Sequence, residues 1–552
     1  MIRKYKNFNE NFEKNKMQKS VLILAVASLI GLAADGLFRN TVSTGIPIGL
    51  GIPLFVQLMA CATIFIAFKS NMPLGRKGLY FLLPALMYSI GFVVRDSPTL
   101  LAIDLGVVFL SMSFAALSLT GVSLTTSGIS TYLSSILSGA ILPFINAADL
   151  LYSYVEWDKL MPQAASRHMR SVMRGLMIGV PITAVFFGLF VSADPAFAAI
   201  VGKSIKFDIG EAFVDSFIVG LFTWMATGYF HTFSLSKMSQ DKGQLLAPVT
   251  APVPILATVG ASGTVDLRPQ MPETLSSTRA LMVSEPESPP GVKLGITEIA
   301  VALGLLNLLF AAFVAVQLKF LFGGASLIGL TPGLTFAEYA RKGFFDLNIA
   351  AALVLPILLW ADHMLVRSSK TSVAIQRGLS FSLLGLLAVV MASALMRMHL
   401  YQTEYGQSEL RFYTTAFMTW LGMVCTIFAG TVLVGKRKFF AFTSFAAGLS
   451  VITGLHVINP DAMIAKANIS HAKTGKSFDA AYAVSLSNDA VPALVKNIDD
   501  LPRGDQRIIA KTLVGQHSGA WKTDWRSFNL SRMFAYQVVN DNKEKLALLA
   551  KD

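Results

Sequence analysis

The chain has 552 residues, of which 53% are hydrophobic and only 14% are charged. Soluble domains carry about 25% charged residues, so this composition excludes an ordinary soluble enzyme and indicates a protein that crosses a membrane several times. The net charge of +13 is typical of Lys and Arg that flank membrane spans. No basic patch is interleaved with exposed aromatic residues, so we expect no nucleic-acid partner.

Apolar runs of about 20 residues predict helices that cross a bilayer. We expect eleven of them, near residues 20–38, 46–68, 79–94, 98–118, 174–192, 211–233, 294–322, 346–366, 378–397, 412–434 and 439–457. The predicted fold class is therefore all-α, a polytopic transmembrane helix bundle. A twelfth span over 130–148 is the alternative, although its serines and Pro143 suit a lipid-facing helix poorly.

Basic residues predict the orientation, because Lys and Arg gather in cytoplasmic loops. The basic tail over residues 1–19 places the N-terminus in the cytoplasm. With eleven spans, the triplet Lys436, Arg437 and Lys438 falls on the same side, whereas a twelfth span at 130–148 would move it outside. We therefore interpret 130–148 as a re-entrant or interfacial segment.

The chain divides into two transmembrane halves and a C-terminal domain. The first half covers 20–235, and a linker over 236–292 follows, with eight prolines between Pro248 and Pro290. This composition predicts a disordered cytoplasmic segment. The second half, 293–457, carries the polar clusters, and 458–552 predicts a small helical domain that eleven spans place outside the cytoplasm.

The first polar cluster follows the span that ends near 322. Glu338, Tyr339 and Arg341 lie within a few residues of one another, and on a helix Glu338 and Arg341 would share a face and could form an ion pair. Thr335 followed by Glu338 also fits a capping box, which is a purely structural explanation. This cluster is thus either part of a polar site or a helix start.

The second polar cluster lies between the spans at 378–397 and 412–434. An Arg fork holds a phosphate or a carboxylate through two hydrogen bonds, so arginines here suit a lipid headgroup or an anionic envelope precursor. The alternative is that they only anchor the span ends in the headgroup region. The residues concerned are Arg397, His399, Tyr401, Glu404, Tyr405 and Arg411.

The predicted topology places both clusters on one side of the membrane, together with Asp194 and Asn459. Four segments that converge on one face could form a single polar site. The competing explanation is that helix ends are polar in general and that these residues pair with one another.

Three acids lie inside predicted spans, where ionisable groups normally face the interior of the bundle. Asp35, Asp104 and Asp215 are compatible with proton coupling or with a structural pairing. We find no phosphate-binding loop, no zinc motif and no nucleophile elbow. The sequence therefore predicts no metal site, no cofactor and no assignable catalytic residue.

The strings LFGG…TFAEYARKGFFDL and RMHLYQTEYGQSELRFY resemble a family of bacterial multi-spanning membrane proteins known only as a domain of unknown function. The resemblance continues from SADPAF at Ser192 through LSNDAVPAL to DWRSFNLSR at Asp524, with Gln407-Ser408 as a departure from the expected Leu-Thr. It implies the inner membrane of a bacterium and no particular activity.

Three functional hypotheses follow. The first is a non-catalytic envelope protein that senses, scaffolds or supports assembly through its outer polar face, with membrane lipids or envelope precursors as partners. The second is a transporter or lipid flippase that uses the intramembrane acids. The third is a membrane-embedded transferase, which the absence of an acid between Arg39 and Gly45 disfavours.

Overall fold

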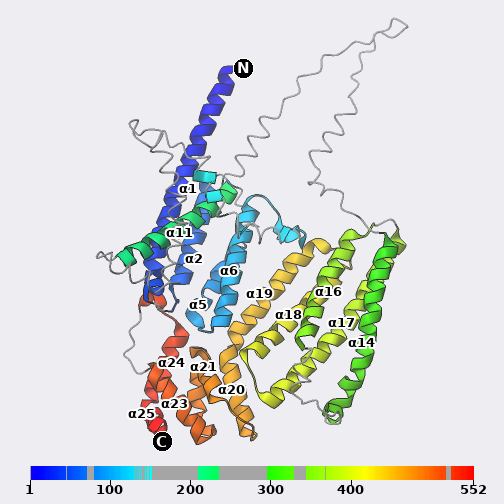
Figure 1. The fold of residues 1–552 in the computed structure, drawn as a ribbon. Helices are drawn as coiled ribbons and strands as arrows, with labels where there is room; N and C mark the ends of the chain where they lie inside the picture. Colours follow the sequence, from blue (N-terminus) through cyan, green and yellow to red (C-terminus); the bar gives the residue numbers. More distant parts are fainter. Residues whose placement is uncertain are drawn as a thin grey trace, which may run out of the picture. The chain divides into compact units, whose positions relative to one another are not determined.

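The computed structural model describes residues 2–44, 47–70, 72, 80–129, 209–234, 295–328, 344–366, 369–517 and 524–551, with scattered positions between 131 and 151. Within these residues all the elements are helices (Figure 1). The predicted all-α fold is therefore confirmed. The linker over 236–292 and the predicted span at 174–192 lie outside the described residues, as does most of 130–148.

Seven segments of the described chain are helical, long and apolar enough to cross a membrane. We conclude that the protein spans a membrane, and its seven segments belong to α1 (Ile2–Thr44), α2 (Gly51–Lys69), α6 (Pro98–Leu119), α14 (Ile296–Ile328), α17 (Lys370–Tyr405), α18 (Glu409–Thr431) and η3 (Arg437–Phe439) with α19 (Phe440–Ile458). Two shorter apolar helical segments are Leu82–Val94, formed by α4 (Leu82–Ser89) and α5 (Gly91–Val94), and Leu353–Met364 within α16 (Phe344–Met364).

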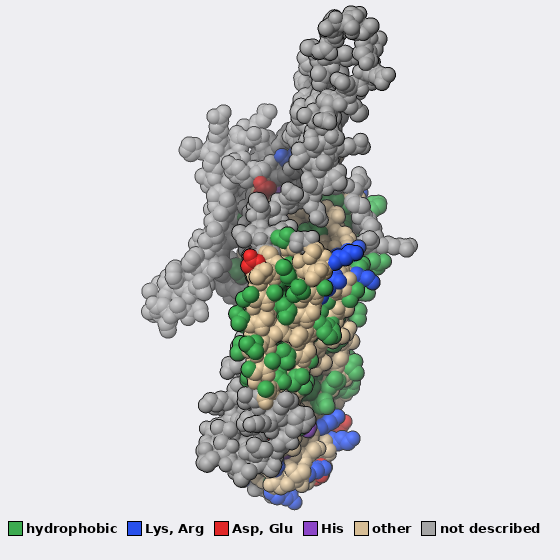
Figure 2. All heavy atoms as spheres, turned by 90° about the vertical axis from the view of Figure 1, so that its right-hand side faces the viewer, with side chains coloured by type: hydrophobic (Ala, Val, Ile, Leu, Met, Phe, Trp, Pro, Cys, Tyr) green, Lys and Arg blue, Asp and Glu red, His purple; other side chains and the backbone are tan. Residues whose placement is uncertain are grey.

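The chain forms two compact units, of which the smaller comprises residues 240–324 and 349–390. In it, the side-chain amide of Asn307 on α14 donates to the carbonyl of Leu379 on α17 at 3.0 Å, which ties these two helices together. α14 exposes the large apolar side chains Val301, Leu305, Leu308 and Leu309. Figure 2 shows hydrophobic side chains spread over the helix surface, as expected where lipid replaces water.

The larger unit comprises residues 1–239, 325–348 and 391–552. In it, α1 packs along α11 (Ile209–Ser234), and the aromatic rings of Phe38, Phe55 and Phe222 meet between α1, α2 and α11. α4 packs on α6, and α18 packs on α19. Buried side chains such as Phe114 and Phe230 fill the spaces between these helices.

The C-terminal part of the larger unit is a domain of short helices with its own apolar core, contributed by residues between Ile464 and Leu549. Its elements are α20 (Pro460–Lys473), α21 (Ala480–Ser485), η4 (Asn488–Ala490), α22 (Val491–Lys496), η5 (Ile498–Asp500), α23 (Arg503–His517), η6 (Trp525–Ser527), α24 (Leu530–Asp541) and α25 (Lys543–Lys551). Figure 1 shows α20 to α25 gathered at the ends of α5 and α19.

Asn459 makes the corner between the membrane helices and this domain. It takes the left-handed conformation with φ 57°, which Asn tolerates better than most residues, so α19 ends and α20 begins at once. Its side-chain oxygen accepts a hydrogen bond from the amide of Ala462 at 3.3 Å. This predicted site residue thus has a structural role as a helix cap.

Candidate functional site

The turn between α5 and α6 is one of the places where the membrane helices contact the C-terminal domain. Asp489 in η4 reaches this turn, and its Oδ2 accepts the backbone N–H groups of Asp96 at 2.7 Å and Ser97 at 3.1 Å. The Arg95 guanidinium lies 3.4 Å from Asp489 Oδ1 and also donates to the carbonyl of His456 at 3.0 Å. A buried carboxylate is thus matched with a guanidinium and two amides, as burial requires.

A second set of contacts ties the same turn to α24. Arg532 donates through Nε to Asp96 Oδ1 at 2.7 Å, and Asn488 donates to Asp96 Oδ2 at 2.7 Å. Asn529 is fully buried, and its amide donates to the carbonyls of Phe92 and Arg95 at 2.9 and 2.7 Å. These residues and those of the preceding paragraph form what we call the docking network: Arg95, Asp96, Asn488, Asp489, Asn529 and Arg532.

Asp461, in the first turn of α20, lies behind the docking network. Its Oδ2 accepts the hydroxyl and the amide of Ser487 at 2.5 and 3.3 Å. Burial raises the pKa of the Asp461 carboxyl, and the Ser487 hydrogen bonds only partly offset this. The buried Oδ1 has no hydrogen-bond partner in the described residues, so the ionised form is incompletely satisfied.

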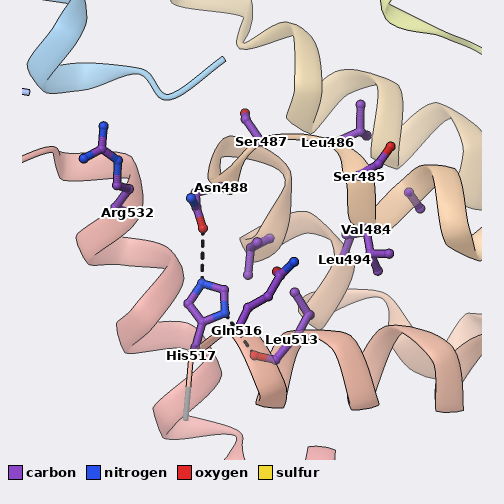
Figure 3. A pocket seen from close by; sticks show the side chains of 12 residues that line it. Val484, Ser485, Leu486, Ser487, Asn488, Leu494, Leu513, Gln516, His517 and Arg532 are labelled. Atoms are coloured by element: carbon purple, nitrogen blue, oxygen red, sulfur yellow. Dashed lines mark hydrogen bonds between the residues drawn. The ribbon is translucent and has the colours of Figure 1, made fainter. Parts of the chain in front are cut away.

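A cavity of about 430 Å³ opens inside the domain beside the docking network. Figure 3 shows Asn488, His517 and Arg532 around it, with Gln516 and Leu513 on α23. His517 Nε2 lies 3.1 Å from Asn488 Oδ1, and Nδ1 lies 3.0 Å from the carbonyl of Leu513. Both ring nitrogens therefore face oxygen acceptors, so this histidine serves to hold Asn488 toward Asp96.

A larger cleft, of about 650 Å³, lies between the α17–α18 turn and the C-terminal domain. We call it the turn cleft. Gly406, with φ +72°, makes the turn. Gln407 and Asn468 then exchange two hydrogen bonds, backbone N–H to Oδ1 at 2.6 Å and Nδ2 to backbone carbonyl at 3.0 Å. The Tyr482 hydroxyl accepts the amide of Glu409 at 2.8 Å. The cleft therefore exists only when the domain is docked.

Two members of the second predicted cluster, Tyr405 and Arg411, line this cleft. The Arg411 guanidinium lies 4.0 Å from the centroid of the Tyr401 ring, and Nη1 donates to the carbonyls of Tyr405 and Gly406 at 3.2 and 2.6 Å. Its neighbour Glu404 pairs with Lys476 at 2.8 Å.

Arg397 and His399 lie on α17, about two helical turns before Tyr405. The Arg397 side chain is partly buried and that of His399 is exposed. Neither lines the turn cleft. Asp194, Glu338, Tyr339 and Arg341 lie outside the residues whose side chains are described. Of the predicted site residues, Tyr405 and Arg411 thus line the turn cleft, whereas Asn459 caps α20 and is not among the lining residues.

The intramembrane acids have different surroundings. Asp215 forms an ion pair with Arg39, and Asp35 on α1 is partly buried with an Oδ1 that has no hydrogen-bond partner in the described chain. Asp104 is fully buried, and its Oδ1 lies 2.9 Å from Nε2 of His456 on α19. The sequence left the partner of Asp104 open, and the structure pairs it with a histidine 352 positions away.

Sequence reasoning did not single out the docking network. The sequence feature that could have indicated this network is the polar segment Arg95-Asp96-Ser97, which separates the apolar runs 79–94 and 98–118. Asn488 and Asp489 precede the apolar run of α22 but do not cap it: the cap of η4 is Ser487, and α22 begins without a side-chain cap. The two side chains instead reach across to the α5–α6 turn, where Asp489 accepts the backbone N–H of Asp96 and Asn488 donates to the Asp96 carboxylate.

The fold and these sites define a membrane-spanning helical protein with a docked helical domain. Residues 82–497 match the family model described as "Domain of unknown function (DUF4153)", and the chain belongs to this family. The predicted resemblance is thereby confirmed, although the matched region begins before Ser192 and ends before Asp524. No curated protein and no solved structure matches the chain.

Proposed function

We propose that this protein is a non-catalytic binding protein of the cell envelope, anchored in the bacterial inner membrane with its N-terminus in the cytoplasm. In this proposal the helix bundle carries the C-terminal domain on its outer face, and the turn cleft receives an envelope component. The observation that supports it best is the joint construction of this cleft by the α17–α18 turn and by α20, α21 and α23. Because the membrane helices and the C-terminal domain both line the cleft, a bound ligand would contact both.

The charges that line the turn cleft indicate what it would bind. Arg411 contributes a guanidinium from α18, whereas Asp479 and Asp505 contribute carboxylates from the domain. Burial raises the pKa of Asp505, and the neighbouring Asp479 carboxylate raises it further. Tyr405, which is 48% exposed, adds an aromatic surface. This combination fits a headgroup that carries both a phosphate and an ammonium group.

The proposal is tested with the full chain purified in mild detergent and titrated with short-chain phosphatidylethanolamine, counting bound molecules by native mass spectrometry. Ala481 is exposed and lines the cleft, so Ala481→Trp fills it without disturbing the core. We expect this variant to bind about tenfold more weakly. Leu548→Trp, at a 65% exposed position on α25, is the matched control and should bind like the unmodified chain.

Short-chain phosphatidylglycerol, which lacks the ammonium group, should bind more weakly than phosphatidylethanolamine. Equal binding of both lipids by the unmodified chain would limit recognition to the phosphate. Equal binding of phosphatidylethanolamine by both tryptophan variants would place its site elsewhere and contradict the proposal.

Transport is the second candidate function, and the specific observation that favours it is the buried Asp104 with one unpartnered oxygen in the described residues. Proton-coupled transporters place such acids inside the bundle. Transport predicts that Asp104→Asn and Asp215→Asn each abolish uptake or efflux of a substrate in cells. Unchanged flux in both variants would exclude transport and leave binding as the remaining candidate function.

A further inference from the structure

We propose that Asp104 and His456 form a proton-binding site that controls the docking of the C-terminal domain through Arg95. The proposal does not depend on what the turn cleft binds, and it rests on contacts among α4, α5, α6, α19 and η4, which all belong to the larger unit.

The first step is the charge of the pair. Asp104 is fully buried on α6, about two helical turns from Pro98, with His456 Nε2 at 2.9 Å. An ionised carboxylate without a compensating charge is costly to bury. A proton on the pair removes this cost, whether it lies on the imidazole or on the carboxyl. The Asp104–His456 pair is therefore expected to have no net charge when it holds one proton, and one negative charge when that proton leaves.

The second step is the space around the carboxylate. Asp104 Oδ2 is buried and has no hydrogen-bond partner in the described residues. It lies against Gly91, where a side-chain methyl group would overlap both Oδ2 and the Cε1 atom of His456. The Gly91 carbonyl in turn accepts the backbone N–H of Arg95 at 2.9 Å. Glycine at this position thus brings the carboxylate within one helical turn of Arg95.

The third step is the connection to the domain. Arg95 donates to the backbone carbonyl of His456 and pairs with Asp489 of η4. The same guanidinium therefore touches the element that carries the imidazole and the element that docks the domain. When the pair is neutral, Asp489 is the nearest anion to Arg95 in these contacts. When the proton leaves, Asp104 becomes a second, buried anion that competes with Asp489 for the guanidinium.

Other ionisable groups face the pair as well. Tyr88 on α4 has its ring 6.1 Å from that of His456, and its hydroxyl lies 2.7 Å from the Thr453 hydroxyl. In the described chain, the titratable and charged groups around the pair are thus Tyr88 from α4, Arg95 after α5 and, behind Arg95, Asp489. Arg95 is the cation among them, so loss of the proton acts on Arg95 first.

The test follows the distance between two spin labels on the full chain, purified in mild detergent without added lipid. Labels replace Leu83 on α4 and Leu548 on α25, which are 59% and 65% exposed, after Cys61 and Cys425 are changed to Ala. At about pH 6 we expect one short distance, and at about pH 9 a second, longer distance should appear. The ratio of undocked to docked molecules should rise about fivefold or more.

Asp104→Asn should abolish this pH dependence, because the neutral amide cannot become the competing anion. The double variant Asp104→Asn/His456→Gln preserves two polar groups without a titratable one, and it should remain docked at both pH values. Asp541→Asn, at an exposed position of α24, should behave like the unmodified chain. If one of the two Asp104 variants does not fold, the other still gives the answer.

An unmodified chain whose distance is the same at both pH values would overturn the proposal. So would a folded double variant that retains the pH dependence of the unmodified chain. Because neither measurement includes a lipid ligand, failure here leaves the binding function of the turn cleft untouched, and failure of lipid binding leaves this result untouched.

Discussion

Asn529 illustrates how one buried side chain can hold a domain onto membrane helices. Its amide donates to the carbonyls of Phe92 and Arg95, and its oxygen caps α24 by accepting the amide of Arg532 at 3.0 Å. The two carbonyls belong to the end of α5, where no further helical turn follows to satisfy them. A single residue therefore completes the ends of two helices.

Asn529→Ala should lower the stability of the protein by about 2–4 kcal/mol, because it leaves buried carbonyls unpaired and removes a helix cap. The measurement is thermal unfolding of the full chain in detergent, followed by intrinsic fluorescence. Asn542→Ala is the matched control, since the Asn542 side-chain amide makes a local hydrogen bond to the carbonyl of Val538 in α24. An equal loss in both variants would show that the cross-domain bonds of Asn529 add nothing.

Asp461 gives the stability a dependence on pH. Because burial raises its pKa above the ordinary value of an aspartate, the folded state binds its proton more tightly than the unfolded state does. Between the ordinary and the raised pKa, stability must fall as the pH rises, since the folded state then loses a proton that the unfolded state has already lost. Below the ordinary pKa, this penalty is absent.

Asp461→Asn should therefore flatten the pH dependence of the melting temperature from about pH 4 upward. The melting temperature of this variant at neutral pH should be higher than that of the unmodified chain. Asp541→Asn, on the exposed side of α24, should leave the profile of the unmodified chain unchanged. A profile that stays as steep after Asp461→Asn would assign the dependence to other groups.

At the scale of elements, the α17–α18 turn depends on a glycine. Gly406 has φ +72°, a conformation that costs residues with a Cβ about 1–2 kcal/mol. A Cβ there would also lie only 2.7 Å from Oδ1 of Asn468, which holds the turn against α20.

Gly406→Ala should therefore destabilise the chain by more than about 1 kcal/mol and weaken phosphatidylethanolamine binding at the turn cleft. Gly422→Ala is the matched change, because Gly422 lies within α18 and its added methyl group would meet only Cε of Met391 at 3.7 Å. It should be neutral or slightly stabilising, since Ala favours helix. The two melting temperatures and two binding curves decide between these outcomes.

The sequence predicted the elements better than their contacts. The spans expected at 98–118 and 439–457 correspond to Pro98–Leu119 and Phe440–Ile458, because apolar runs bounded by polar residues mark the part of a helix that lipid surrounds. The span expected at 378–397 lies within the longer α17, Lys370–Tyr405. Hydropathy ends where the polar residues begin, but backbone hydrogen bonds continue the helix beyond that point.

The contacts of the candidate sites could not be predicted in the same way. The partner of Asp104 is 352 positions away, and Asn529 bonds to carbonyls more than 430 positions away. Helical periodicity says which residues share a face, but it does not say which helix that face meets. The sequence marked the second cluster as polar, but the use of Arg411 to hold the turn carbonyls depends on a backbone shape that no pattern encodes.

At the scale of the whole molecule, the orientation of the chain determines which ligands can reach the turn cleft. The basic residues near 1–19 and at Lys436, Arg437 and Lys438 are expected in the cytoplasm. η3 carries Arg437 and Lys438 at the start of the segment Arg437–Ile458, and Asn459 follows its other end. If Lys436 is cytoplasmic, crossing by α19 carries α20 and the domain to the opposite side.

Paired reporters fused after Asp552 test this orientation directly. An alkaline phosphatase, which is active only outside the cytoplasm, should be active, whereas a green fluorescent protein, which fluoresces only inside, should remain dark. Fusions after Gly435 in the turn between α18 and η3 should give the reverse result. A fluorescent C-terminal fusion would place the turn cleft in the cytoplasm, and its ligand would then have to be sought among the molecules of that compartment.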